Sequence, residues 1–350
     1  INELTSPGAR FALGMAEDPD VGSNSLQGYE LEDNGLFAVE SKESPDGSKF
    51  AELVLLRALD REREQSLRLV LTALDGGDPP RSGTAQLCIN VTDANDNAPV
   101  FAQERYRASV REDAPPGSAV LNVSASDADA GTNARITYGF GKMPTKVLQK
   151  FLLDAENGMI TLLESLDFED MRGYTLLVEA KDGGGLVAHC KVEVEVLDVN
   201  DNTPEIALTS VSSPVPEDAP VGTVVALLKV RDRDSGENGQ VWCELSGEAP
   251  LSLVSSSGGS YKVLVLAKTL DREEASLHEL VLRATDGGEP SRTATARLRV
   301  VVLDANDNAP VFSQEEYKVR VPEDMPVGSI LVTLTATDAD EGTNGHVKYS

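Results

Sequence analysis

One motif recurs three times in this 350-residue chain and constrains its fold more than any other feature. It reads Asp-x-Asn-Asp-Asn and begins at Asp93, Asp198 and Asp304, at spacings of 105 and 106 residues. Repetition at this period indicates successive structural units of about 105 residues rather than one large core. We therefore predict domains at residues 1–97, 98–202 and 203–308, followed by the start of a fourth at 309–350.

Three other motifs accompany each copy in a constant order. One is Leu-Asp-x-Glu, about thirty residues earlier, and another is a glutamate before a Pro/Gly-rich turn near the start of each unit. The third is Asp-x-Asp with an asparagine four residues after the second aspartate, which occurs four times. The copies are Asp60/Glu62, Asp167/Glu169 and Asp271/Glu273; Glu112, Glu217, Glu323 and the looser Glu3; and Asp18/Asp20/Asn24, Asp127/Asp129/Asn133, Asp232/Asp234/Asn238 and Asp338/Asp340/Asn344.

The segments between these motifs alternate apolar and polar residues with period two, as half-buried strands do. Lys191 to Val196 places three valines on one face, and Arg297 to Val302 does the same with Leu298, Val300 and Val302. Asp-Gly-Gly turns break the strands at corresponding places. We predict an all-β chain of tandem immunoglobulin-like sandwiches, about seven strands each, with short Pro-containing linkers that are rigid rather than flexible.

The charge balance raises a question about the carboxylates. The formal net charge is −27, with 58 Asp plus Glu against 31 Lys plus Arg. So acidic a chain repels phosphate backbones and anionic lipid headgroups, so nucleic-acid and membrane-surface binding are disfavoured. A folded chain tolerates clustered carboxylates when bound cations neutralise them, and calcium prefers six to eight oxygen ligands.

The motifs predict calcium ligands at three joints between repeats. We expect carboxylates to supply most of them, with the asparagine side chain and backbone carbonyls completing the shells. The first joint takes Glu3, Asp60, Glu62, Asp93, Ala94, Asn95, Asp96, Asn97, Asp127, Asp129, Asn133 and Asp182. The second takes Glu112, Asp167, Glu169, Asp198, Val199, Asn200, Asp201, Asn202, Asp232, Asp234, Asn238 and Asp286. The third takes Glu217, Asp271, Glu273, Asp304, Ala305, Asn306, Asp307, Asn308, Asp338, Asp340 and Asn344, and the same motifs add Asp18, Asp20, Asn24 and Asp75.

Other interpretations of these residues fit less well. Asp/Asn/Pro clusters form ordinary turns, but turn chemistry does not require a distant Asp-x-Glu. An EF-hand needs Gly at its sixth position, where this chain has Ala98 or Ala309. The three histidines occupy unrelated positions in their repeats, and no nucleophile-elbow motif is present, so we predict no enzymatic activity.

The combined motif set resembles that of the cadherin superfamily along the whole chain. Segments such as Ser6-Pro7-Gly8-Ala9-Arg10-Phe11 and Leu71 to Gly83 are similar to clustered protocadherins, of gamma type. The resemblance implies a fragment running from the second repeat to the start of the fifth, with about three calcium ions per complete joint and about nine in all. Two departures from the family pattern are Phe168 in place of arginine and Thr203-Pro204 in place of Ala-Pro.

The resemblance also implies a function. It predicts a neuronal single-pass plasma-membrane protein whose extracellular repeats pair antiparallel in trans with the same isoform, giving calcium-dependent homophilic adhesion. Other protocadherins would be cis partners through parts outside this sequence, and no small-molecule substrate is expected. The alternatives are a mechanical spacer of a longer cadherin or a heterophilic adhesion receptor.

Two remaining features bear on an extracellular location. Sequons at Asn90 and Asn122 permit N-glycosylation if the chain is secreted. The cysteines Cys88, Cys190 and Cys243 form no CxxC pair, and we expect no disulfide among them, with Cys190 buried and Cys88 facing outward. No stretch approaches the ~20 apolar residues of a membrane span.

Overall fold

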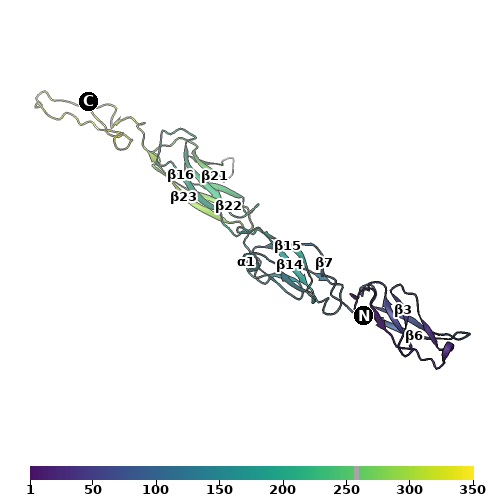
Figure 1. Cartoon of the computed structure of the whole chain (residues 1–350). Helices are drawn as coiled ribbons and strands as arrows, with labels where there is room; N and C mark the ends of the chain where they lie inside the picture. Colours follow the sequence, from purple (N-terminus) through teal and green to yellow (C-terminus); the bar gives the residue numbers. More distant parts are fainter. Residues whose placement is uncertain (256–259) are drawn as a thin grey trace. The chain divides into compact units, whose positions relative to one another are not determined.

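The structure is a computed structural model, and it describes residues 1–255 and 260–350. The chain divides into two compact units. The first comprises Ile1–Leu166 with Met171–Val196 and contains two β-sandwiches. The second comprises Asp167–Asp170 with Leu197–Ser350 and contains a third sandwich and the short final segment. Figure 1 shows the paired strands of each sandwich, coloured along the sequence.

The first sandwich consists of two three-stranded sheets. Their orders are β1-β4-β3 and β2-β5-β6, and a parallel bridge between Asn2 and Thr92 stands where the later sandwiches have a strand beside their equivalent of β6. Its elements are β1 (Arg10–Ala12), η1 (Gly22–Asn24), β2 (Leu26–Leu31), β3 (Phe37–Glu43), β4 (Lys49–Leu55), β5 (Ser66–Asp75) and β6 (Ser82–Asn90).

The second sandwich repeats this topology with the additional strands β7, β8 and β10. The main sheets are β11-β14-β15-β8 and β12-β13-β9, and β10 pairs with β7. The elements are β7 (Val100–Phe101), β8 (Arg105–Arg111), β9 (Ala119–Asn122), β10 (Ala125–Ser126), β11 (Thr137–Phe140), α1 (Thr145–Leu148), β12 (Phe151–Leu153), β13 (Met159–Leu162), β14 (Gly173–Lys181) and β15 (Val187–Leu197).

The third sandwich has two four-stranded sheets, β16-β18-β21-β20 and β17-β23-β22-β19, in which the short β17 runs parallel to β23. Its strands are β16 (Glu205–Val211), β17 (Val215–Pro216), β18 (Val224–Arg231), β19 (Val241–Ser246), β20 (Leu251–Ser255), β21 (Tyr261–Leu266), β22 (Leu277–Asp286) and β23 (Thr293–Leu303). The final segment forms one small pair, β24 (Val311–Phe312) with β25 (Ala336–Thr337).

Period-two burial places a separate core inside each sandwich. On β15, Val192, Val194 and Val196 are at most 2% exposed, and on β23 Leu298, Val300 and Val302 are buried in the same way. The predicted inward faces of both strands are therefore confirmed. So is the all-β class, since the only helices among the described residues are the short α1 and η1.

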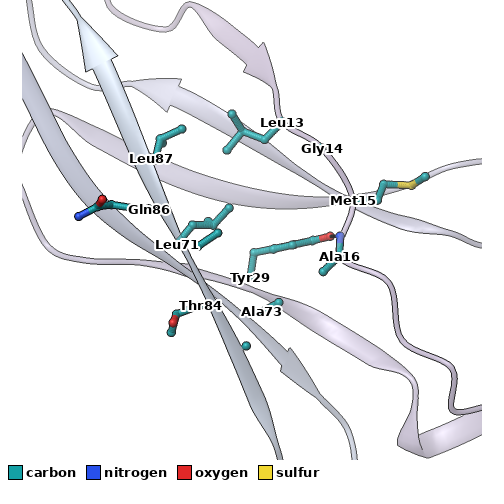
Figure 2. Close-up of a pocket in the computed structure, with 12 residues that line it drawn as sticks. Leu13, Gly14, Met15, Ala16, Tyr29, Leu71, Ala73, Thr84, Gln86 and Leu87 are labelled. Atoms are coloured by element: carbon teal, nitrogen blue, oxygen red, sulfur yellow. Dashed lines mark hydrogen bonds between the residues drawn. The ribbon is translucent and has the colours of Figure 1, made fainter.

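The first sandwich also has an apolar cavity of about 460 Å³ between its sheets. Figure 2 shows Leu13, Leu71 and Leu87 around it, with Tyr29 reaching across toward Ala16. In the second sandwich the equivalent edge, that of β15, pairs with β8, whose Tyr106 and Val110 are buried. The cavity thus lies on the inner side of a sheet edge that β8 covers in the second sandwich.

Candidate calcium sites

The glutamate near the start of a repeat is anchored by the backbone of two other motifs. Glu3 is 2% exposed and accepts hydrogen bonds from the Arg61 N–H at 2.8 Å and the Ala94 N–H at 2.6 Å. Glu217 makes the equivalent bonds to Arg272 and Ala305, both at 2.6 Å. Glu3 had the least typical sequence context of the predicted ligands, yet it occupies the same place as Glu217.

The anchored glutamates gather other carboxylates around them. Ligand atoms of Glu3, Glu62 and Asp93 lie within 4.8 Å of one another, and so do those of Glu62, Asp96 and Asp129. In the second unit the same distance holds within two further sets, Glu169/Asp198/Asp234 and Glu217/Asp271/Glu273. Glu62 and Asp129, which lie on opposite sides of the first linker, therefore converge on one small volume.

Several aspartates at the joints use one carboxylate oxygen for a hydrogen bond within the local fold and leave the other oxygen available to a ligand. Asp127 Oδ1 accepts the Asp129 N–H at 2.9 Å, and Asp182 Oδ1 accepts the N–H groups of its Gly-rich turn. The other oxygen of each is buried with no hydrogen-bond partner in the described part of the chain. The same state is found for Asp129 Oδ2, Asp232 Oδ2, Asp286 Oδ2 and Asp340 Oδ2.

Such oxygens are costly unless a cation compensates them. A buried, unpaired carboxylate oxygen loses its hydration without gaining a partner, so the arrangement is destabilising by itself. Oxygen ligands converging from several carboxylates are the donor set that calcium prefers. The residues present therefore fit a hard divalent cation, and when bound it would supply the positive charge that these oxygens lack.

A glycine in the next repeat makes room for the linker asparagine. Asn95 Oδ1 is buried and unpartnered among the described residues, and a Cβ added at Gly184 would lie 2.1–2.4 Å from the Asn95 side chain. Asn200 and Gly288 repeat this relationship at 2.2 Å. Only glycine allows the Asp-Gly-Gly turn to approach so closely, so this turn helps to build the site as well as reversing the chain.

The remaining asparagines fasten the linker to the following repeat. Asn97 donates its side-chain amide to Asp129 Oδ1 at 2.8 Å, and Asn202 and Asn308 bond Asp234 and Asp340 in the same way. Their NH2 groups therefore hold the linker in place, and the backbone carbonyl remains the predicted ligand atom. The carbonyls of Ala94, Val199 and Ala305 each accept a local N–H from the aspartate two residues later, and a carbonyl has a second lone pair for a metal.

The crowded carboxylates are electrostatically strained. Burial, followed by the charges of Glu3 and Asp129, raises the pKa of Asp96 above its ordinary value. Burial and then the charge of Glu3 raise the pKa of Glu62, although Arg61 opposes this. Asp201 and Asp307 also have raised pKa values, with burial the largest cause. Each of these groups resists ionisation, which is what an anionic cluster without its cation should do.

The other predicted ligands vary in their surroundings. Glu112 is 4% exposed within the second sandwich, whereas Asn306 is exposed at the third joint. Asp20 N–H bonds Asp18 Oδ1 at 3.0 Å and Arg81 N–H bonds Asp75 Oδ1 at 2.7 Å, so the first repeat forms the same local turns as the later ones. Asn24 is exposed.

Sequence reasoning missed two arginines inside the Asp-x-Glu motifs. Arg61 Nε lies 2.5 Å from Asp93 Oδ1, and the same guanidinium bonds Glu62. Arg272 Nε lies 2.6 Å from Asp304 Oδ1 and its Nη2 lies 2.6 Å from Glu273. The only signal was the residue between the two acids, Arg in two copies and Phe168 in the third.

Comparison with known proteins identifies the family of this chain. The cadherin domain matches three stretches, residues 1–92, 106–197 and 212–303. The chain belongs to the cadherin family. The cadherin domain binds calcium, which agrees with the predicted chemistry of the joints, and cadherin-family adhesion proteins are not enzymes, which supports the prediction of no catalytic activity.

Individual relatives indicate which group of cadherins this chain is similar to. Protocadherin gamma-B2 from Homo sapiens is 52% identical over 350 residues, covering 100% of this chain and 38% of that protein. The structure of Protocadherin Gamma B2 extracellular cadherin domains 1-5 superposes with a TM-score of 0.93 at 50% identity, covering 99% of this chain and 65% of the other. A structure described as a Protocadherin gammaB7 EC3-6 cis-dimer superposes with a TM-score of 0.63 at 45% identity. The match covers 70% of this chain and 57% of the other. These similarities support the resemblance to clustered protocadherins.

Features outside the joints concern the cysteines, the sequons and the helices. Cys88, Cys190 and Cys243 are free, with Cys190 buried and Cys88 exposed. Asn90 and Asn122 are both exposed, at the ends of β6 and β9, so each is accessible to a glycan. Among the described residues, none of the helices has the length and apolar character needed to cross a membrane.

Proposed function

We propose that this cadherin is part of the extracellular region of a clustered protocadherin on the neuronal plasma membrane, spanning its second repeat to the start of its fifth. The chain spans 38% of the length of its curated gamma-B2 relative, so adhesion by the intact protein belongs to this proposal. The proposed activity is calcium-dependent homophilic adhesion, with second repeats meeting third repeats and first meeting fourth in antiparallel trans pairs. Other protocadherins would bind in cis.

The observation that carries the proposal is the set of buried carboxylate and asparagine oxygens without partners at the linkers. About three calcium ions per complete joint, and about nine in this chain, would satisfy them. The ligands are proposed to be the motif residues named above, with the boundaries between repeats at residues 97, 202 and 308.

Calcium would act by fixing each linker. A recognition surface that extends over several repeats needs fixed joint angles, because only then do the separate faces meet their partners together and add their contributions. The affinity expected for extracellular calcium modules, about 10⁻⁴ to 10⁻³ M, leaves the joints empty at cytosolic calcium concentrations.

The decisive experiment is sedimentation equilibrium of this chain joined to the repeat that precedes it in its gene. Measurements at about 1 mM calcium and with chelator should give a dimer only in calcium. A monomer in both conditions, with normal calcium binding by calorimetry, would reject homophilic recognition in favour of a spacer or a heterophilic receptor.

A further inference from the structure

The two arginines of the Asp-Arg-Glu motifs reach across their joints. Arg61 Nη2 donates to the carbonyl of Ala128 at 3.0 Å, and Ala128 lies between the two aspartates of the following repeat. Arg272 Nη2 donates to Ala339 at 3.1 Å, in the equivalent position. Each guanidinium therefore touches carboxylates of one repeat and the backbone of the next.

Both arginine side chains are largely buried and hydrogen-bonded. Each can therefore act as a strut, by which we mean a fixed side-chain link between one repeat and the next. The side chain of Arg61 is only 11% exposed and that of Arg272 13%. Both arginines also donate their backbone N–H to the anchored glutamate of the joint, at 2.8 Å and 2.6 Å. A planar guanidinium can satisfy several acceptors at fixed angles, which a flexible ammonium cannot do.

From these contacts we infer that the guanidinium groups of Arg61 and Arg272 supply a permanent positive charge at the first and third joints. Each neutralises part of the carboxylate cluster and keeps the Asp-x-Asp loop docked when calcium is scarce. The arginine is thus a positioning residue, which holds the ligand loop near its bound place before an ion arrives. This inference rests on the proposed calcium-binding function, which it extends to the calcium-free state.

The second joint is a natural comparison within the same chain. Phe168 replaces the arginine there, and Arg233 stands between Asp232 and Asp234 in place of the alanine. An aromatic ring cannot donate hydrogen bonds to a carbonyl or a carboxylate. The second joint therefore lacks an arginine at the strut position, and its cation is instead Arg292, whose Nε donates to the linker carbonyl of Asn200 at 2.9 Å. We expect its Asp-x-Asp loop to depend on calcium more than the equivalent loops of the other two joints do.

Amide hydrogen exchange on the whole 350-residue chain tests the inference. In chelator, Arg61→Met should make the 127–133 loop exchange about tenfold faster, the change expected for loss of one charge-assisted hydrogen bond. In saturating calcium the same variant should differ from the parent by less than about twofold, because the ion then holds the loop. Arg61→Lys should restore only part of the protection.

Matched variants separate the specific contacts of Arg61 and Arg272 from the general effect on exchange of removing any positive charge. Arg63 is exposed two residues away, so Arg63→Met should leave loop exchange unchanged in both conditions. Unchanged exchange in β5 verifies that the first sandwich remains folded. Arg272→Met, with Lys268→Met as its control, should act in the same way on residues 338–344, and Phe168→Arg should slow exchange of residues 232–238 in chelator.

The possible results are distinct. If Arg61→Met and Arg272→Met exchange like the parent chain in chelator, the inference is wrong. If calcium fails to slow exchange at residues 93–97 and 127–133 of the parent chain, the proposed calcium function fails instead. The comparison in chelator still decides the role of the arginines in that case.

Discussion

Asn133 donates its side-chain amide to Asp93 at 2.8 Å, across a joint and across 40 residues of sequence. The same hydrogen bond joins Asn238 to Asp198 at 2.8 Å, and a third joins Asn344 to Asp304 at 2.9 Å. Asp93 Oδ1 also accepts the Ala130 N–H at 2.9 Å. The first aspartate of the linker motif therefore binds the following repeat directly, in addition to any metal.

Removing this amide should weaken calcium binding while leaving both sandwiches folded. Asn133→Ala removes the amide that orients the Asp93 carboxylate, and losing such an outer-shell partner lowers metal affinity about 10–100-fold, so calcium affinity at the first joint should fall at least about tenfold. Isothermal titration calorimetry measures the affinity. Gln103→Ala, which removes an exposed amide outside the motifs, is the control and should change little; equal affinities for Asn133→Ala and the parent chain would refute the role.

Asp96 provides the direct test of the ligand assignment. Asp96→Ala should weaken calcium binding at the first joint and abolish homophilic recognition, because a cluster ligand is lost, without lowering the thermal midpoint of the calcium-free protein. Asp33→Ala removes an exposed aspartate and should alter neither property. Recognition retained with normal calcium affinity would show that Asp96 is not a ligand.

Gly184 should not tolerate a methyl group. Its Cβ would overlap the end of the Asn95 side chain, so Gly184→Ala must displace that side chain or the turn, at a cost of about 1–3 kcal/mol. We expect weaker calcium binding and a lower thermal midpoint in calcium. Gly139→Ala is the control, because nothing lies within 4 Å of the added atom there; equal losses in the two variants would mean that the effect is not specific to the joint.

The raised pKa values predict how pH acts on the calcium-free protein. The pKa of Asp96 is raised by burial and neighbouring charge, so protonation favours the folded cluster. Its contribution is complete below its ordinary pKa of 3.8 and is lost as pH rises through the elevated value.

Asp96→Asn mimics the protonated side chain and tests that sign. The calcium-free variant should be more stable than the parent at neutral pH, and the difference should shrink as the pH is lowered toward 4. Chemical denaturation at several pH values gives the free energies of unfolding, with Asp33→Asn as control. A less stable Asp96→Asn at neutral pH would contradict the predicted direction.

The free thiols should differ in reactivity. Burial raises the pKa of Cys190 to about 11, so little thiolate forms near neutral pH, whereas Cys88 is exposed. A maleimide at neutral pH should label Cys88 rapidly and leave Cys190 unlabelled in the folded protein, as peptide mass spectrometry would reveal. Rapid labelling of Cys190 without unfolding would show that β15 opens locally.

The amino-acid sequence alone determined the repeat, the inward faces of the strands and the residue types at the joints. Apolar alternation along β15 and β23 is a local pattern, and burial of one face of each strand follows from it directly. Four motifs in constant order likewise identified which acidic residues should converge, since a cation site needs several oxygens and turns do not require them all.

Only the tertiary structure decided how each side chain divides its atoms between fold and site. The sequence cannot say that Asp182 uses Oδ1 for its turn and leaves Oδ2 unpartnered, or that Asn97 and Asn133 commit their amides across the joint. It also gave no sign that Arg61 reaches the carbonyl of Ala128. Motif spacing specifies which groups come near one another, but hydrogen bonding depends on direction as well as distance, and direction is fixed only when the two repeats and their linker pack together.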